Sequence, residues 1–180
     1  MRMIQGHDID DVYLSILWQK LHKQQLLRRV FYEGSCTREI EFIQFARRED
    51  ISLFCIEDKN TPLAIVWLNT WEGYTARIHF CGFREAWGEP KSVFLGNAIH
   101  RELFSATRAD GSPYVITLVG VIPATNVLAL KYIEKIGYRR SGIWPGACYI
   151  KRLNKHVDAV TSYCNIQTFR ESYGNSISKT

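Results

Sequence analysis

The sequence has no apolar run that approaches the roughly 20 residues of a membrane-spanning helix. Its first residues, MRMIQGHDIDDVY, lack the apolar core of a secretory signal. The five cysteines include no CxxC pair, and three of them, Cys55, Cys81 and Cys148, lie in apolar runs. We therefore expect no membrane contact, no metal site, and reduced thiols in a cytoplasmic protein.

Internal repeats, linkers and low-complexity segments are also absent. With 180 residues, a hydrophobic fraction of 46% and an aromatic fraction of 13%, the chain can bury one sizeable core. We expect a single domain over residues 1–170. The polar residues 171–180 are expected to form a disordered C-terminal tail.

Acidic residues are fewer than basic ones, 18 against 23, which gives a net charge of +5. The densest basic group, residues 20–29, lies on a predicted amphipathic helix without interleaved aromatic residues or any nucleic-acid motif. We favour a solvated basic face over nucleic-acid binding for this group. A cofactor that carries phosphates would suit the same charge balance.

Hydrophobic periodicity and turn residues predict ten elements in the order α-α-β-β-β-α-β-α-β-β. Their expected ranges are helices 8–32 and 37–48, strands 52–57, 63–71 and 74–81, helix 90–107, strand 114–122, helix 126–136, and strands 143–151 and 157–169. The strand-helix-strand segment predicts at least one parallel pair beside an antiparallel meander. The expected class is α/β (α+β), with a mixed, mostly antiparallel sheet flanked by about four helices.

The stretch NVLALKYIEKIGYRRSG, residues 126–142, carries the most specific pattern. Asn126 suits a helix N-cap, and Gly137 suits the left-handed residue that ends a helix. This stretch resembles the strand-helix-strand segment of the GCN5-related N-acetyltransferase (GNAT) superfamily, especially its ribosomal-protein alanine N-acetyltransferase branch, which reads approximately N-x-x-(S/A)-x-x-(apolar)-(apolar)-E-K-x-G-(F/Y)-x-x-x-G. The matching residues are Asn126, Ala129, Tyr132, Ile133, Glu134, Lys135, Gly137, Tyr138 and Gly142.

Asp158 matches the aspartate that opens the last strand in that branch, so the motif covers residues 126–160. The element order matches over residues 37–169. A generic capped helix is the alternative explanation of the motif. The resemblance implies an acetyl-CoA-dependent N-acyltransferase with a splayed parallel strand pair, where pantetheine pairs with the strand edges of residues 74–81 and 115–122.

The same resemblance assigns residues to coenzyme A. They are Phe80, Cys81, Phe83, Arg84, Gly88, Lys91, Asn126, Ala129 and Tyr132. Asn126 is expected to contact the cofactor arm and to cap the helix at the same time. For Tyr132 we favour the alternative of a packing aromatic at helical spacing.

The pyrophosphate loop departs from the family pattern (Q/R)-x-x-G-x-(G/A). Alignment on Gly88 puts Glu85 at the basic or amide position and Pro90 at the second small one, and Pro90 lacks an N–H donor. A register from Arg84 instead puts Trp87 and Glu89 at the glycine positions, and Glu89 would bring a negative charge toward the diphosphate. Arg84 and Lys91 can compensate as side-chain phosphate ligands. Loss of coenzyme binding stays open as an alternative.

The family's proton-donating tyrosine stands seven residues after the Asn, but here the tyrosine, Tyr132, comes one residue earlier. A shift of one residue turns a helical side chain by about 100°. Two residues are candidates for the base that deprotonates the amine, His79 and Glu85. By strand alternation, Arg77 and Cys81 lie on the same face of the strand as His79. A merely hydrogen-bonded His79 is the alternative.

The leading hypothesis is an acetyl-CoA-dependent N-acetyltransferase that works by direct attack of a small-molecule or peptide amine on the thioester. The alternative is a non-catalytic GNAT-like binding or structural protein, of the kind also found in phages and prophages, that has lost coenzyme A binding. A homodimer is compatible with either hypothesis. Nucleic-acid binding ranks below both.

Overall fold

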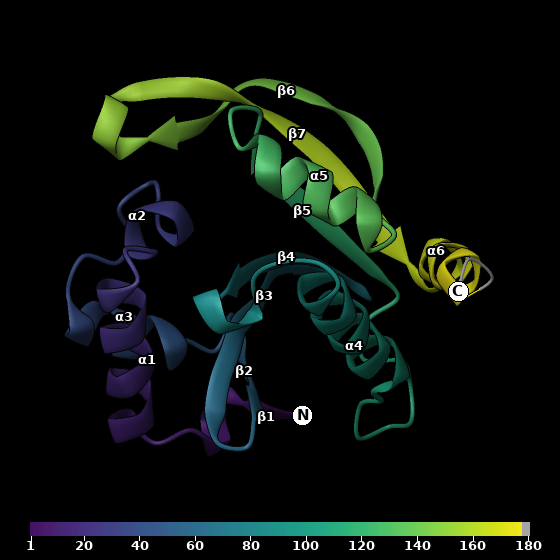
Figure 1. The fold of residues 1–180 in the computed structure, drawn as a ribbon, viewed down its shortest axis with the longest axis horizontal. Helices are drawn as coiled ribbons and strands as arrows, with labels where there is room; N and C mark the ends of the chain where they lie inside the picture. Colours follow the sequence, from purple (N-terminus) through teal and green to yellow (C-terminus); the bar gives the residue numbers. More distant parts are fainter. Residues whose placement is uncertain (178–180) are drawn as a thin grey trace. The chain divides into compact units, whose positions relative to one another are not determined.

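The computed structural model describes residues 1–177, and seven of its strands form one sheet (Figure 1). The strands are β1 (Arg2–Gln5), β2 (Ser52–Asp58), β3 (Thr61–Glu72), β4 (Thr75–Gly82), β5 (Thr117–Pro123), β6 (Arg139–Ile150) and β7 (Lys155–Asn165). The α-helices are α1 (Asp11–Lys23), α2 (Leu27–Val30), α3 (Glu39–Ala46), α4 (Lys91–Ser105), α5 (Val127–Lys135) and α6 (Ile166–Ile177). Short 3-10 turns are η1 (Gly6–Asp8), η2 (Arg84–Ala86) and η3 (Lys151–Leu153).

The strand order in the sheet is β1-β2-β3-β4-β5-β7-β6. The β1–β2, β2–β3 and β5–β7 ladders are antiparallel, whereas the β4–β5 ladder is parallel. Helix α4 connects the two parallel strands, as a crossover connection requires. The predicted fold class, a mixed and mostly antiparallel sheet with a parallel pair, is therefore confirmed, with six α-helices described where about four were expected.

The described chain divides into two compact units. Unit 1 consists of Met1–Asn69, Ile78–Gly88 and Tyr149–Lys155, and unit 2 consists of Thr70–Arg77, Glu89–Cys148 and the chain from His156 onward. The prediction of a single domain over residues 1–170 stays a prediction.

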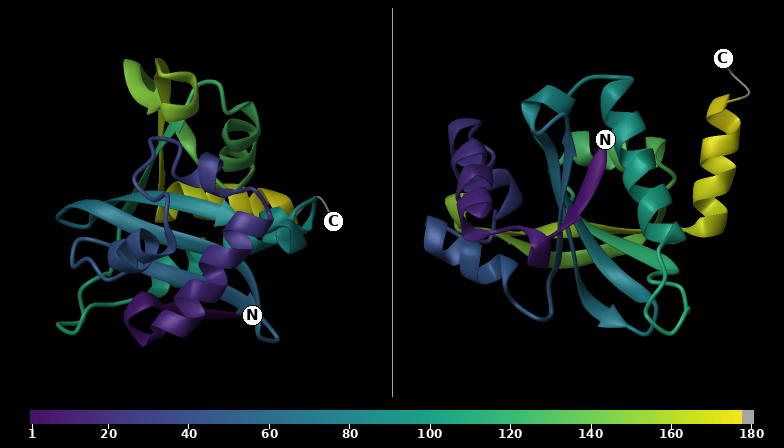
Figure 2. Two further views of the ribbon diagram at one scale, coloured as in Figure 1. Left: turned by 90° about the vertical axis from the view of Figure 1, so that its left-hand side faces the viewer. Right: turned by 90° about the horizontal axis from the view of Figure 1, so that it is seen from below.

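Helices α1 and α3 of unit 1 pack against each other (Figure 2). Helix α1 begins where the Asp10 carboxylate accepts a hydrogen bond from the Tyr13 N–H at 2.7 Å, and its apolar face is fully buried at Leu14, Leu17 and Leu21. These leucines recur at helical spacing, so one stripe of the helix enters the core. The predicted helix over residues 8–32 is thus observed as two helices, α1 and α2.

Aromatic side chains fill much of the unit 1 core. The rings of Phe31 and Trp67 stack with their centroids 5.6 Å apart, and Phe31 also meets Phe42 edge-on at 6.1 Å. Such ring pairs stabilise the core beyond the contribution of the area that each ring buries. The core therefore ties the segment after α2 to strand β3 and helix α3.

In unit 2, helix α5 packs against helix α4 at a glycine. A Cβ atom at Gly96 of α4 would lie 2.4 Å from the Tyr132 hydroxyl and 2.9 Å from a methyl group of Ile136. Only a residue without a side chain allows this approach. Gly137, with φ of 94°, ends the segment after α5 in the left-handed conformation predicted for it.

Two segments differ from the predicted elements. Residues 2–5 form β1, which the sequence did not indicate, and residues 166–169 begin α6 where a strand was expected. Asn165 and Thr168 cap α6 reciprocally, because each side-chain oxygen accepts from the other residue's backbone N–H, at 2.9 and 3.0 Å. Helix α6 also includes residues 171–177, where an unstructured tail was expected, and residues 178–180 lie outside the described residues.

All five cysteines are buried and form no disulfide. Burial raises the pKa of the thiols of Cys36, Cys55 and Cys164 to about 11, and that of Cys81 to about 12. Within residues 1–177, no helix has both the length and the hydropathy of a membrane span. The same residues contain no group of three or more His, Cys, Asp or Glu placed to hold a metal ion.

Candidate active site

The parallel ladder between β4 and β5 is short. It pairs Thr75 with Thr117, Ala76 with Leu118, and Arg77 with Val119. Strand β4 then continues to Gly82, while the following residues of β5, from Gly120 to Pro123, pair with β7. Beyond Arg77, the backbone of β4 is therefore not used by this ladder.

Arg77 stands at the last pair of the ladder and was considered in the sequence only as a neighbour of His79. Its Nε atom is buried and has no hydrogen-bond partner among the described residues. A buried donor without an acceptor costs free energy, so such a group is unusual in a native structure. Strand alternation places Arg77 on the same face as His79, and this is the sequence signal for its position beside the candidate base.

The imidazole ring of His79 is held by two contacts within unit 1. It stacks on the indole ring of Trp67, with centroids 4.7 Å apart and planes within 3°, and its Nε2 lies 3.2 Å from Oδ1 of Asn69. The side chain is half-buried. These contacts fix the orientation of the ring, which suits either an oriented base or the hydrogen-bonded histidine weighed as the alternative.

Glu85, the second candidate base, is engaged with helix α1. Its two carboxylate oxygens accept hydrogen bonds from Nζ of Lys20 at 2.8 Å and from Nε2 of Gln24 at 3.0 Å. Burial alone would raise the pKa of this carboxyl, but the hydrogen bonds from Lys20 and Gln24 outweigh it and lower the pKa to about 2. A carboxylate held in this way is a weak proton acceptor.

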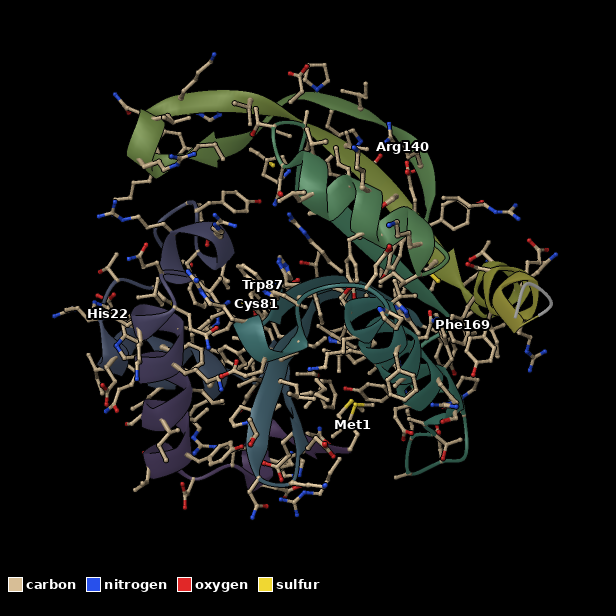
Figure 3. The ribbon with its side chains drawn as sticks, in the orientation of Figure 1. Met1, His22, Cys81, Trp87, Arg140 and Phe169 are labelled. Atoms are coloured by element: carbon tan, nitrogen blue, oxygen red, sulfur yellow. The ribbon has the colours of Figure 1, made fainter. Side chains whose placement is uncertain are left out.

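The apolar residues assigned to coenzyme A at the end of β4 differ in exposure. Phe80 is 37% exposed, whereas Cys81 and Phe83 belong to the buried core of unit 1. Figure 3 labels Cys81 on β4 and Trp87 on the loop that follows. A ligand at this strand end would meet the side chain of Phe80 but only the backbone of Cys81 and Phe83.

In the loop after β4, four backbone N–H groups are already hydrogen-bonded. The N–H groups donate to acceptors within unit 1 as follows: Phe83 to the Leu63 carbonyl (2.8 Å), Arg84 to Oε1 of Gln24 (2.7 Å), Ala86 to the Phe83 carbonyl (2.9 Å) and Trp87 to the Arg84 carbonyl (3.1 Å). A loop that binds phosphate needs such donors to point at the anion. These four N–H groups are therefore not presented to an anion.

Side chains, rather than backbone donors, supply the positive charge around this loop. Arg84 is exposed and lies over the indole ring of Trp87, with its guanidinium carbon 5.4 Å from the centroid. Gly88 has φ of 88°, and nothing lies within 4 Å of the place its Cβ would occupy. Lys91 is exposed at the first position of α4.

Glu89, two residues before Lys91, forms an ion pair with Lys135 at the end of α5. This contact lies within unit 2, so the carboxylate of Glu89 is held toward α5. The pairing offsets part of the negative charge that Glu89 brings to the start of α4.

Asn126 caps α5 as predicted. Its Oδ1 accepts a hydrogen bond from the Ala129 N–H at 3.3 Å, and its own N–H donates to the Pro123 carbonyl at 2.8 Å. Asn126 is exposed and Ala129 is half-buried, so the amide group of Asn126 can meet a ligand while it caps the helix.

Tyr132 serves the packing of α4 and α5. Its hydroxyl donates to the Ser92 carbonyl at 3.0 Å and lies against Gly96. Burial raises the pKa of the Tyr132 phenol. A phenol held between two helices is a packing residue, the role favoured from the sequence.

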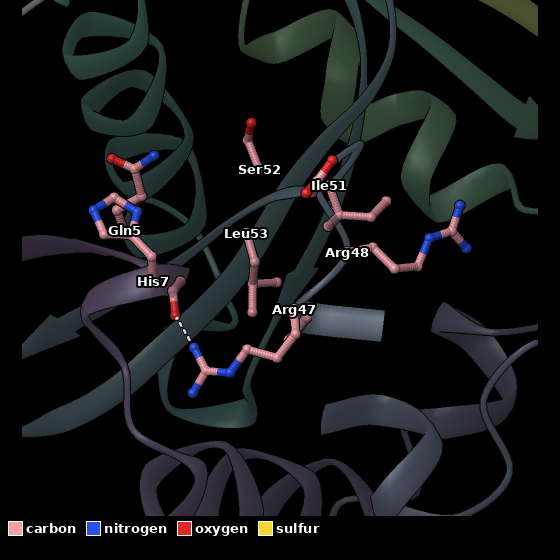
Figure 4. Close-up of a pocket in the computed structure, with 10 residues that line it drawn as sticks. Gln5, His7, Arg47, Arg48, Ile51, Ser52 and Leu53 are labelled. Carbon is pink, nitrogen blue, oxygen red and sulfur yellow. Dashed lines mark hydrogen bonds between the residues drawn. The ribbon is translucent and has the colours of Figure 1, made fainter. Parts of the chain in front are cut away.

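A pocket of about 330 Å³ lies in unit 1 beside β1 and the end of α3 (Figure 4). Two cations line it, but Arg47 donates to the Gly6 carbonyl at 2.8 Å and pairs with Asp11, while Arg48 pairs with Asp50. None of the predicted site residues lines this pocket. Its cations are already neutralised, so it does not offer a site for an anionic cofactor.

The predicted residues thus fall into two sets. Unit 1 contains His79, Phe80, Cys81, Phe83, Arg84, Glu85 and Gly88, and unit 2 contains Lys91, Asn126, Ala129 and Tyr132. Within each set the residues are neighbours along β4 and its loop, or along the facing helices α4 and α5.

No protein-family model and no curated protein matches the sequence. Solved structures, in contrast, match over nearly the full chain. A spermidine N-acetyltransferase from Vibrio cholerae in complex with CoA and spermine is 12% identical, with a TM-score of 0.73 over 93% of this chain and 96% of that chain.

Two further structures give the same result. The ribosomal L7/L12 alpha-N-protein acetyltransferase RimL in complex with coenzyme A is 13% identical, with a TM-score of 0.69 over 89% of this chain and 92% of that chain. A GNAT-family acetyltransferase from Bacillus anthracis is 13% identical, with a TM-score of 0.66 over 92% of this chain and 95% of that chain. At such identity these similarities establish the fold alone, and the chain has the fold of the GNAT superfamily.

Proposed function

Starting from this acetyltransferase fold, we propose that the chain is an N-acetyltransferase that moves an acetyl group from acetyl-CoA to an amine. The observation that carries the proposal is the fold itself, which the chain shares with acetyltransferases solved in complex with CoA. The sequence motif over residues 126–160 supports it independently.

The pantetheine arm of the donor carries amide groups, which can pair with a strand backbone as an added strand would. We assign this contact to β4 at Phe80 and Cys81, because the ladder of β4 with β5 ends at Arg77. Within unit 2, Asn126 and Ala129 at the start of α5 are the candidates for contact with the arm.

For the diphosphate we propose two candidate ligands, each considered within its own unit: Arg84 in unit 1 and Lys91 in unit 2. Both are exposed cations, while four backbone N–H groups of the loop, those of Phe83, Arg84, Ala86 and Trp87, already have acceptors. Charged side chains hold phosphate through charge-assisted hydrogen bonds, which are stronger than neutral ones. In this proposal charged side chains supply phosphate contacts that those four N–H groups do not.

In the reaction, the amine nitrogen attacks the thioester carbonyl carbon, so that a C–N bond forms and the C–S bond breaks. The ammonium proton goes to a base, and coenzyme A leaves as a thiolate that takes up a proton. We assign His79 as the base, because its ring is oriented by Trp67 and Asn69 and its ordinary pKa lies near neutrality. Glu85, with its pKa of about 2, is assigned to the ion pair with Lys20 instead.

A second candidate function follows from the loop after β4. Four of its N–H groups are already hydrogen-bonded, and Glu89 adds a carboxylate next to it, which favours a GNAT-like protein that no longer binds coenzyme A and serves as a binding or structural protein. Coenzyme affinity separates the two functions.

Calorimetric titration with acetyl-CoA provides that test, with single variants Arg84→Ala, Lys91→Ala and Asn126→Ala. Loss of one charge-assisted contact to phosphate is expected to weaken binding about tenfold. Arg101→Ala is the matched control, because Arg101 is an exposed cation on the same helix as Lys91. Absence of heat from a folded protein at millimolar ligand would favour the non-catalytic function.

Transfer is then measured by mass spectrometry with a panel of amines. His79→Gln is expected to lower kcat more than Glu85→Gln does, because the Glu85 carboxylate is engaged by Lys20 and Gln24. We also place the protein in the cytoplasm, where its five buried thiols would stay reduced, and the homodimer stays a prediction.

A further inference from the structure

Five exposed cations of unit 1 come from two segments far apart in the sequence. Arg28 and Arg29 lie on α2, and Lys151, Arg152 and Lys155 lie on or next to η3, the turn between β6 and β7. We call these five residues the basic patch. Figure 1 shows α2 beside this turn.

Backbone contacts hold the two segments together. The Lys151 N–H donates to the Tyr32 carbonyl at 2.9 Å. The side chain of Lys151 packs on Gly34, and its Cδ lies 2.3 Å from the position that a Cβ of Gly34 would occupy. The turn is braced by Asn154, whose Oδ1 accepts from the Tyr149 hydroxyl at 2.9 Å. The cations of the patch are thus mounted on a fixed surface.

The five cations of the patch are gathered on two adjoining segments, and none of them is neutralised by an ion pair among the described residues. Elsewhere the cations of several helices and strands form ion pairs: Lys20–Glu85, Arg38–Glu41, Arg47–Asp11, Arg48–Asp50, Lys135–Glu89, Arg139–Glu171 and Arg140–Glu134. Among residues 1–177, no ion pair involves a member of the basic patch. The acid in the adjoining loop, Glu33, accepts a hydrogen bond from Ser35.

We propose that the basic patch docks an acidic polypeptide segment and thereby selects, as the acceptor of the transferase, an amine that is followed by Asp and Glu residues. The inference deepens the proposed function and rests on it for the transfer step, while the docking itself does not require transfer. Like charges repel, so the same surface disfavours a polyamine acceptor.

A nucleic acid fits the patch less well than an acidic peptide. Helix α2 has only four residues, too few to lie along a groove of duplex DNA. The two tyrosines at the patch, Tyr32 and Tyr149, are half-buried and not displayed as a platform for stacking bases. Spaced carboxylates of an extended peptide, in contrast, can each meet one exposed cation.

The patch also reaches the strand that carries the candidate site. Gln24, three residues before α2, accepts a hydrogen bond from the Arg84 N–H in the loop after β4 at 2.7 Å. The segment that leads into α2 therefore lies against the end of β4. A peptide held at α2 can present its amine toward that strand end.

The test measures binding of a short fluorescent peptide with a free amino terminus followed by alternating Asp and Glu, in the absence of acetyl-CoA. Its counterpart carries Asn and Gln at the same positions. The variant Arg28→Glu/Arg152→Glu changes two patch cations, and the matched control Arg101→Glu/Arg170→Glu changes two exposed cations of unit 2 by the same total charge. Lys151 is left unchanged because its side chain packs on Gly34.

We expect the acidic peptide to bind the native protein and the control variant alike, and to bind the patch variant roughly tenfold more weakly at about 50 mM salt. Equal binding of the acidic and neutral peptides, or equal binding by the patch variant, would overturn the docking inference. So would a single-stranded or duplex oligonucleotide that binds the patch more tightly than the acidic peptide.

Transfer assays on the same peptides keep the two proposals apart. A higher KM with unchanged kcat in the patch variant supports both. If the acidic peptide binds but no amine is ever acetylated, the proposed function fails and the docking stands. If spermine and the neutral peptide are acetylated as well as the acidic one, the transferase stands and the docking inference fails.

Discussion

The most direct test of the unit 2 core is the pH dependence that His100 imposes on folding. The imidazole is 2% exposed on α4, its Nε2 lies 3.0 Å from the Tyr138 hydroxyl, and its Nδ1 is buried without a partner among the described residues. The rings of Phe104 and Phe169 lie beside it, with centroids 6.0 and 5.7 Å away. Burial therefore lowers the pKa of His100 from 6.5 to about 4.

A histidine with a depressed folded-state pKa binds its proton more readily when unfolded. The unfolded chain is thus favoured as the pH falls from about 6.5 to about 4, and the full effect is about 3 kcal/mol. Between pH 7 and pH 5 the expected loss in the free energy of unfolding is about 2 kcal/mol.

Urea unfolding followed by tryptophan fluorescence measures this loss. His100→Gln keeps a polar partner for Tyr138 but does not titrate, so its stability is expected to change by about 2 kcal/mol less over that interval. His22→Gln is the control, because His22 is an exposed histidine of α1 (Figure 3). If the free energy of unfolding changed equally with pH in the native protein and in His100→Gln, the reasoning would be refuted, since His100 would then bind its proton as readily in the folded chain as in the unfolded chain.

Three further outcomes are expected. Asn126→Ala lowers the free energy of unfolding by about 1 kcal/mol because the cap of α5 is lost, whereas Asn126→Asp keeps most of it, as thermal melts would show. Gly96→Ala costs about 1–3 kcal/mol despite the better helix propensity of alanine, because its Cβ would lie 2.4 Å from the Tyr132 hydroxyl; in a Tyr132→Phe background the urea midpoint falls less, and equal losses would contradict this origin. Glu85→Gln lowers the free energy of unfolding by less than about 1 kcal/mol, because the ion pair with Lys20 is partly exposed. The pKa of the Glu85 carboxyl is lowered to about 2, so this stabilisation is present above the ordinary pKa of a glutamate and is lost as the pH falls to about 2. The stability of the variant therefore depends less on pH in that range.

Local signals in the sequence were sufficient for much of the fold. The meander of β2, β3 and β4 follows from apolar runs separated by turn residues, and α5 follows from Asn126 and Gly137, whose capping roles depend on a few neighbouring atoms. The parallel pair follows from element order alone. These features are local or topological, so a single sequence contains them.

Other features depend on distant partners. Strand β1 is held by the pair of Arg2 with Glu57, 55 residues away, and four residues show no clear period. In the candidate site, the weak basicity of Glu85 depends on Lys20, 65 residues earlier, which no local pattern reveals. The start of α6 was a missed local signal, because Asn165 and Thr168 have the spacing of a reciprocal cap.

The five buried thiols allow the rate of opening of this chain to be measured by alkylation. With their pKa values raised, the thiols of Cys36, Cys55, Cys81 and Cys164 remain protonated at neutral pH and are shielded from alkylating reagents. Cys36, Cys55 and Cys81 lie in unit 1, and Cys148 and Cys164 lie in unit 2. The rate at which each is alkylated under native conditions therefore reports, without any engineered probe, how often each unit opens.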